Sequence, residues 1–174
     1  MGIFIHDLPN HYPETQQVYS VIIDDDRIRT IVTKHSSTVD HWNSMIYSEY
    51  NGVLDNLIVD EIPSSLVEFL GDPDFTFVGD GIGEDVKKLD DDYDLEVEVV
   101  FDLRCLDADR YNSKELKNAG LMGLAGIVLN YGDTQKKPRH VTMSNREDYL
   151  LSLDQIKYAC VDAYVSFQIG KELI

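Results

Sequence analysis

The chain has 174 residues, a length that suits one domain with a substantial core. Hydrophobic residues make up 43% of it, too many for a chain disordered throughout, and no apolar run reaches the roughly 18 residues that a membrane span needs. The formal net charge of −17 argues against tight, metal-free binding to duplex nucleic acid, because an acidic surface repels phosphate. It does not exclude a site at which bound metal ions supply the positive charge.

The compartment is indicated by the cysteines and the N-terminus. Neither Cys105 nor Cys160 has another Cys or His at metal-ligand spacing, so we expect two reduced thiols in an intracellular protein. The opening MGIFIHDLPNHYPE has no basic region and no long apolar stretch, so it does not resemble a secretory signal. We expect no membrane association, and both nucleus and cytoplasm stay open.

The first part of the chain predicts a leader, a hairpin and a helix. Residues 1–17 are polar and contain two prolines, so we expect a loose leader before a domain spanning residues 18–174. Val18–Ile23 and Ile28–Thr33 are β-rich runs joined by a polar turn, which is a hairpin signal. Apolar residues at helical spacing then predict a helix over residues 39–50.

The rest of the chain alternates between strand-like and helix-like patterns. The expected elements are a short apolar segment at 53–59, a helix at 60–70, a strand at 75–79, a helix at 84–89, an acidic loop at 90–94, a strand at 97–103, a helix at 113–129, a polar loop at 130–145 and a helix at 154–173. This alternation predicts an α/β domain with a mixed sheet flanked by helices.

Two segments carry candidate functional residues. Phe75–Leu89 (FTFVGDGIGEDVKKL) predicts a strand that turns tightly into a helix, with Asp85 in the first helical turn, where the helix dipole favours an acid. Helix capping is the structural alternative for Asp85. Gln155–Leu173 (QIKYACVDAYVSFQIGKEL) predicts one helix with Tyr158 and Asp162 four residues apart, hence on one face. For this pair the alternative is an interfacial tyrosine beside a surface aspartate.

The two segments resemble the second and third motifs of the DEDDy 3′–5′ exonucleases, and most closely the plant branch of the Werner-type exonuclease domain family. The resemblance covers about residues 18–173. It is carried further by DEIPSSLVEFL, FDLRCLDADRYNSKELKNAGLMGLAGIVLN and PRHVTMSNREDYLLSLDQIKYACVDAYVSFQIGKEL. It implies a ribonuclease-H-like fold.

The resemblance also implies an activity and a site. Members of that family hydrolyse DNA or RNA from the 3′ end with Mg²⁺ or Mn²⁺, and some form ring-like oligomers. Carried over to matching positions, Asp85 and Asp162 would be metal ligands and Tyr158 would orient the attacking water. Single-stranded 3′ ends and further copies of this chain or related exonucleases would be its partners. DNA versus RNA preference stays open.

One part of the family pattern is missing. The family carries three strands between the helix at 39–50 and Asp60, and the first strand holds a catalytic Asp-x-Glu. Here only about residues 51–59 occupy that place, and Asp55 is followed two residues later by Leu57. Neither Asp24-x-Asp26 nor Asp60-Glu61 aligns with the missing motif.

Two expectations follow from the missing segment. The N-terminal half of the sheet should be shortened, with the exposed strand edge covered by the N-terminal hairpin or by another subunit. Catalysis should be impaired, because two of four carboxylates are absent. The alternatives are a non-catalytic relative that acts as a binding or oligomer partner, and a truncated splice form.

Overall fold

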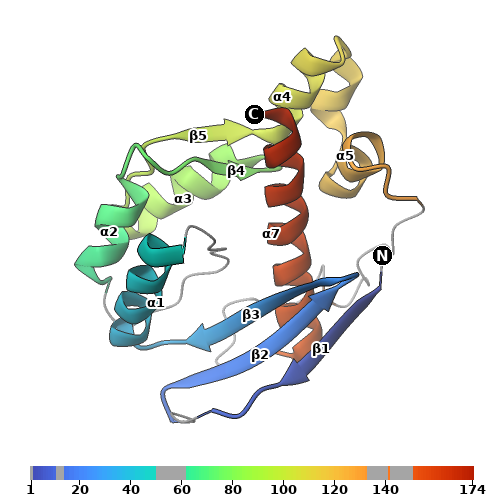
Figure 1. Cartoon of the computed structure of the whole chain (residues 1–174). Helices are drawn as coiled ribbons and strands as arrows, with labels where there is room; N and C mark the ends of the chain where they lie inside the picture. The colour runs from blue at the N-terminus through green and yellow to red at the C-terminus, as the bar shows by residue number, and fades with distance from the viewer. Residues whose placement is uncertain (1, 11–13, 50–61, 133–140, 142–150) are drawn as a thin grey trace. The chain divides into compact units, whose positions relative to one another are not determined.

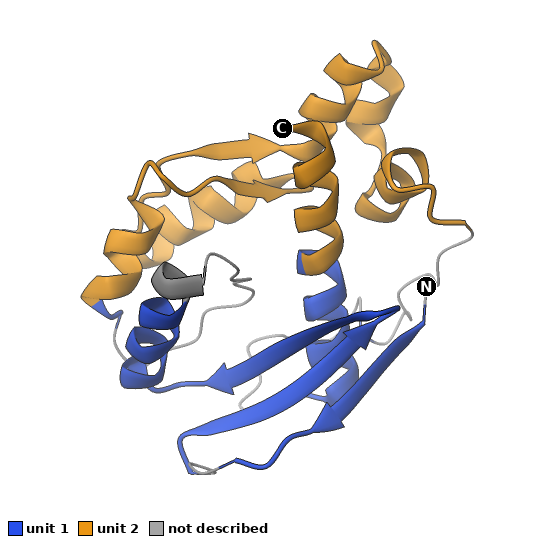
Figure 2. Ribbon diagram, in the orientation of Figure 1, with its two compact units in different colours: residues 1–63, 135–163 blue, residues 64–134, 164–174 orange. Residues whose placement is uncertain are grey.

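The computed structural model of the chain describes residues 2–10, 14–49, 62–132, 141 and 151–174 (Figure 1). The chain divides into two compact units (Figure 2). Unit 1 combines Met1–Pro63 with Gln135–Ala163, and unit 2 combines Ser64–Thr134 with Tyr164–Ile174. The C-terminal helix α7, Leu153–Leu173, contributes its first half to unit 1 and its second half to unit 2.

Unit 1 contains a three-stranded antiparallel sheet in the order β1-β2-β3. Its strands are β1 (Ile3–Asp7), β2 (Gln16–Ile23) and β3 (Asp26–Thr33), and helix α1 (Ser36–Glu49) follows. The predicted hairpin is confirmed, with longer strands and a tighter turn than expected. Ile23 pairs with Asp26 across the turn, and Asp24 takes a φ of 53°, which aspartate tolerates better than most residues.

The expected loose leader is wrong, because residues 3–7 form the edge strand β1. The segment alternates Ile3 and Ile5 with more exposed residues, a period that suits a strand. Its start is fixed to the hairpin turn by two hydrogen bonds between the same residues. The Gly2 amide donates to Asp24 Oδ1 at 2.7 Å, and the Asp24 amide donates to the Gly2 carbonyl at 2.9 Å. The two prolines of the leader lie beyond this strand.

The core of unit 1 forms around β2, whose residues Val18 to Val21 are all buried. The first half of α7 packs against β3, where Thr30 Oγ1 and Cys160 Sγ lie 3.0 Å apart. Cys160 is buried and forms no disulfide among the described residues. In α1, Val39 is buried whereas Trp42 is half-buried.

Unit 2 is built on a strand–helix–strand unit. Strands β4 (Phe77–Gly79) and β5 (Val100–Asp102) pair in parallel, and α3 (Ile82–Tyr93) connects them. Helix α2 (Ser64–Leu70) packs through Phe69, whose ring centroid lies 4.8 Å from that of Phe75. The second half of α7 approaches β4 so closely that a Cβ on Gly170 would lie 2.9 Å from Val78 Cγ2.

Three short helical elements complete unit 2. They are α4 (Leu103–Arg110), the 3₁₀ turn η1 (Lys114–Asn118) and α5 (Leu121–Val128). The single helix predicted over 113–129 is therefore wrong: Ala119 and Gly120 take extended conformations that interrupt it. The predicted loop over residues 90–94 is wrong as well, because α3 continues to Tyr93 and ends at Asp94 in the left-handed conformation.

The α/β class is confirmed. Parallel and antiparallel pairing are both present, in two separate sheets among the described residues. The hairpin belongs to the sheet of unit 1. Its predicted role in covering an exposed strand edge stays a prediction. The shortened stretch at 51–59 lies outside the described residues. Within the described chain no helix is long and apolar enough to cross a membrane.

Candidate active site and its supporting cluster

The pair Tyr158 and Asp162 lies on the part of α7 that belongs to unit 1. The helical repeat places both side chains on one face, nearly opposite Cys160, which faces β3. Tyr158 is only 5% exposed and Asp162 is half-buried. Burial, with a smaller contribution from the charge of Asp154, raises the pKa of the Tyr158 phenol. Tyr158 therefore stays a neutral hydrogen-bond donor at physiological pH.

Asp85 occupies the predicted position in the first turn of α3, in unit 2. Its side chain is exposed and makes no hydrogen bond or ion pair within the described residues. The N-cap of α3 is Gly81, so Asp85 does not cap the helix. Asp85 is therefore not the N-cap residue, although its charge still lies in the first turn, where the helix dipole favours an acid.

The turn from β4 into α3 depends on Gly81. This residue has a φ of 75°, a left-handed conformation that glycine adopts at little cost. A Cβ at this position would also lie 2.8 Å from the Nη2 atom of Arg104. The sequence prediction that a glycine permits the tight turn is confirmed at this one position.

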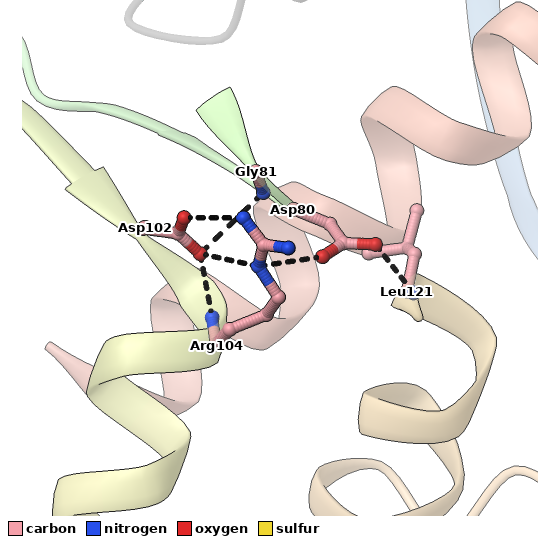
Figure 3. Close-up of polar contacts among 5 residues, drawn as sticks. All are labelled: Asp80, Gly81, Asp102, Arg104 and Leu121. Carbon is pink, nitrogen blue, oxygen red and sulfur yellow. Dashed lines mark hydrogen bonds and ion pairs between the residues drawn. The ribbon is translucent and has the colours of Figure 1, made fainter. Parts of the chain in front are cut away.

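A polar cluster missed by sequence reasoning surrounds this turn (Figure 3). We call Asp80, Asp102 and Arg104 the strand-end cluster, because the two aspartates lie at the carboxyl ends of β4 and β5. Arg104 Nε lies 3.3 Å from Asp80 Oδ1 and 3.2 Å from Asp102 Oδ1, and Arg104 Nη2 lies 2.9 Å from Asp102 Oδ2. One guanidinium thus bridges both carboxylates.

The same carboxylates also bind backbone amides of three helices. Asp102 Oδ1 accepts from the Arg104 amide at 2.9 Å as the N-cap of α4, and more weakly from the Gly81 amide at 3.4 Å. Asp80 Oδ2 accepts from the amide of Leu121, the first residue of α5, at 2.8 Å. Hydrogen bonds from the Arg104 side chain are the main reason that the pKa of Asp102 is lowered. The cluster therefore joins two strand ends to three helix starts.

A sequence signal for this cluster exists. An aspartate directly follows each of two apolar strand-like runs, in FVGD and VVFD, and parallel strands bring their carboxyl ends to one edge. Because Gly79 pairs with Asp102, the two ends meet in register. The signal could predict proximity of the aspartates, although not the bridge by Arg104.

The candidate residues fit a divalent cation in kind. Carboxylate oxygens such as those of Asp85 and Asp162 are the donors that Mg²⁺ and Mn²⁺ prefer. In number they fall short, because the described residues contain no group of three or more His, Cys, Asp or Glu side chains that could hold a metal. The structure brings Tyr158 and Asp162 together on α7 and describes Asp85 within unit 2. Asp55, Asp60 and Glu61 lie outside the described residues, whereas Asp24 and Asp26 lie at the hairpin turn.

Comparison with known proteins finds relatives named as 3′-5′ exonucleases or as proteins with a 3′-5′ exonuclease domain. Exonuclease 3′-5′ domain-containing protein 2 of Homo sapiens is 34% identical over 113 residues, which are 65% of this chain and 18% of that protein. A 3′-5′ exonuclease of Arabidopsis thaliana is 34% identical over 112 residues, which are 64% of this chain and 38% of that protein. The chain thus spans well under half the length of these relatives.

The structural comparison is weaker than the sequence comparison. Crystal structures of the EXD2 exonuclease domain soaked in Mg or in Mn align over 96% and 98% of this chain, and over 72% and 75% of theirs. Their sequence identities are 23% and 22%, and the TM-score is 0.32 for both, so the likeness adds no weight to an assignment. The decisive match is that of the 3′-5′ exonuclease family model, which covers residues 14–174. The chain therefore belongs to the 3′-5′ exonuclease family.

Proposed function

We propose that the chain is a DEDDy-type exonuclease domain of the Werner type, which uses Asp85 and Asp162 as metal ligands and Tyr158 to orient a water. The observation that carries this proposal is the pairing of a buried, neutral Tyr158 with Asp162 on one face of α7. The uncommitted carboxylate of Asp85 in the first turn of α3 supports it. When bound, Mg²⁺ or Mn²⁺ would activate a water and stabilise the leaving oxygen of a phosphodiester.

The proposed roles of the chain's own groups follow from their environments. The neutral phenol of Tyr158 can donate its proton in a hydrogen bond to a water oxygen, and burial keeps the ring in place. Two carboxylates supply fewer anionic oxygen ligands than four would, so the cation should bind weakly. We therefore expect turnover of single-stranded 3′ ends orders of magnitude below that of an intact relative.

The test uses the full chain and single strands of DNA and of RNA labelled at the 5′ end, with Mg²⁺ or Mn²⁺. Slow shortening from the 3′ end that is lost in Asp162→Ala and Asp85→Asn, and strongly reduced in Tyr158→Phe, would support the assignment. The matched control is Asp91→Asn, an exposed aspartate on the same helix as Asp85, which should leave the rate unchanged. Cleavage that survives Asp162→Ala would refute the site.

A second candidate is a non-catalytic relative that binds further copies of itself or intact exonucleases. It is favoured by the stretch at 51–59, which lacks Asp-x-Glu. The Arabidopsis 3′-5′ exonuclease is a suitable comparator. Absence of both cleavage and Mn²⁺ binding, together with a defined oligomer in light scattering, would favour this candidate. A transcript that encodes Asp-x-Glu between residues 50 and 60 would instead identify the chain as a splice form.

A further inference from the structure

We propose that Arg104 is a positioning residue that holds the carboxylate of Asp85 in place through the turn between β4 and α3. The inference rests on the proposed function, in which Asp85 is a metal ligand. It assigns a role to the strand-end cluster, which makes no hydrogen bond or ion pair with Asp85 within the described residues. The cluster and Asp85 both belong to unit 2.

The start of α3 lacks a side-chain cap of its own. Its N-cap residue is Gly81, which has no side chain to accept from the first amides of the helix. Glycine also leaves the backbone free to adopt many conformations, so something else must select the observed φ of 75°. The groups that contact Gly81 itself come from β5 and α4.

Three contacts restrain the turn from that side. The guanidinium of Arg104 lies against Gly81, in the space where another residue would carry a Cβ. Asp102 accepts a hydrogen bond from the Gly81 amide, and Arg104 Nε binds the side chain of Asp80, the residue before Gly81. The Asp102–Arg104 ion pair therefore binds the turn both at the backbone of Gly81 and at the side chain of Asp80.

The bridge is itself well fixed. Arg104 is the second residue of α4, so its backbone is set by the Asp102 cap, and its side chain returns to both oxygens of the same Asp102. The Arg104 side chain as a whole is 35% exposed. An arginine fork can hold both carboxylates at once, whereas a lysine ammonium is a single point charge.

The position of Asp85 depends on this turn, because only the first turn of α3 separates them. Asp85 is the fourth residue of α3, one helical turn from Gly81. A change in the direction of the turn would move the Asp85 carboxylate with the helix start. Residues that orient metal ligands without contacting the metal typically change metal affinity by about 10–100-fold when they are removed.

The experiment measures two properties of Arg104→Ala, Arg104→Lys and wild type. Amide hydrogen exchange without metal reports how often the turn opens at Gly81 and Glu84, whose amides donate hydrogen bonds to Asp102 and to the Gly81 carbonyl. Titration with Mn²⁺, followed by electron paramagnetic resonance, reports the affinity of the metal site. The matched control is Arg110→Ala, which removes an exposed arginine from the same helix, one without an ion pair within the described residues.

We expect Arg104→Ala to speed exchange at Gly81 and Glu84 and to weaken Mn²⁺ binding by about 10-fold or more. Arg104→Lys should recover part of both losses, and Arg110→Ala should change neither. Unchanged exchange in Arg104→Ala, or faster exchange with unchanged Mn²⁺ affinity, would overturn the inference while leaving the proposed function intact. Absence of Mn²⁺ binding in wild type would overturn the proposed metal site and the role of Arg104 with it.

Discussion

The buried carboxyl of Asp107 yields a prediction about stability. This side chain lies on α4, is fully buried, and neither of its oxygens has a hydrogen-bond partner within the described residues. Burial raises the pKa of the Asp107 carboxyl, because the charged form loses its hydration. We expect Asp107→Ala to increase the free energy of unfolding.

The magnitude follows from three contributions. A buried polar group without a partner costs about 1–3 kcal/mol, which the alanine variant regains. Replacement of aspartate by alanine inside a helix adds about 0.5 kcal/mol of helix propensity. The lost side-chain volume costs about 0.8 kcal/mol for each methylene-sized group removed. A carboxyl counts as about two such groups, so the net expectation for Asp107→Ala at neutral pH is a stabilisation of up to about 2 kcal/mol.

The pH dependence of this effect has a definite sign. Because the folded pKa of Asp107 is raised, the folded chain holds this proton at pH values where the unfolded chain has released it. Stability falls with rising pH wherever the folded state binds more protons. The cost of Asp107 is therefore smallest below the unfolded pKa of about 3.9 and grows as pH rises toward the folded pKa. Asp107→Asn should remove this pH-dependent part alone.

Urea unfolding followed by far-UV circular dichroism between acidic and neutral pH measures both effects. The control is Asp109→Ala, an exposed aspartate on the same helix, which shares the propensity gain without the burial. Its change should stay within about 0.7 kcal/mol and should show little pH dependence. A destabilised Asp107→Ala, or a stability difference between wild type and Asp107→Asn that does not change with pH, would refute the reasoning.

Two glycine substitutions test close packing and backbone conformation, each against a glycine that has room for a Cβ. Gly170→Ala should lower the free energy of unfolding by about 1–3 kcal/mol, because the added Cβ would lie 2.9 Å from Val78. The control Gly123→Ala should raise it by about 0.5–1 kcal/mol. Equal effects of the two substitutions in urea unfolding would contradict the packing of α7 on β4. Gly81→Ala should lower the free energy of unfolding by about 1–2 kcal/mol from its positive φ alone. The control Gly83→Ala should be neutral or stabilising, because an added Cβ there would meet no atom within 4 Å. A neutral Gly81→Ala in the same assay would mean that the turn adopts another conformation.

The elements that sequence reasoning predicted well are those specified by their own residues. Helix α7 begins within one residue of its expected start, because a long periodic pattern defines it. The hairpin β2–β3 follows from two β-rich runs around a polar turn. The candidate pair on α7 needs only helical spacing, so it too could be placed from the sequence.

The elements that it missed depend on residues elsewhere in the chain. Strand β1 is short and polar enough to suggest a leader, and it forms because β2 offers an edge with which it can pair. The helix expected over 113–129 is interrupted at Ala119 and Gly120, and the new start at Leu121 is bound by Asp80, 41 residues earlier. In both cases a tertiary contact overrides a local preference that differs by fractions of a kcal/mol per residue.

The strand-end cluster shows why part of a site escapes local reasoning even when its motifs are recognised. The motif segment containing Asp85 predicts a turn and a helix, yet this turn is bound by Asp102, the last residue of the next strand, and by Arg104 in the helix that follows it. Their approach follows from the parallel register of Gly79 with Asp102, which no pattern within either segment specifies. A motif can therefore identify the group that performs the chemistry, whereas the groups that hold it in place become visible only when the strands are paired.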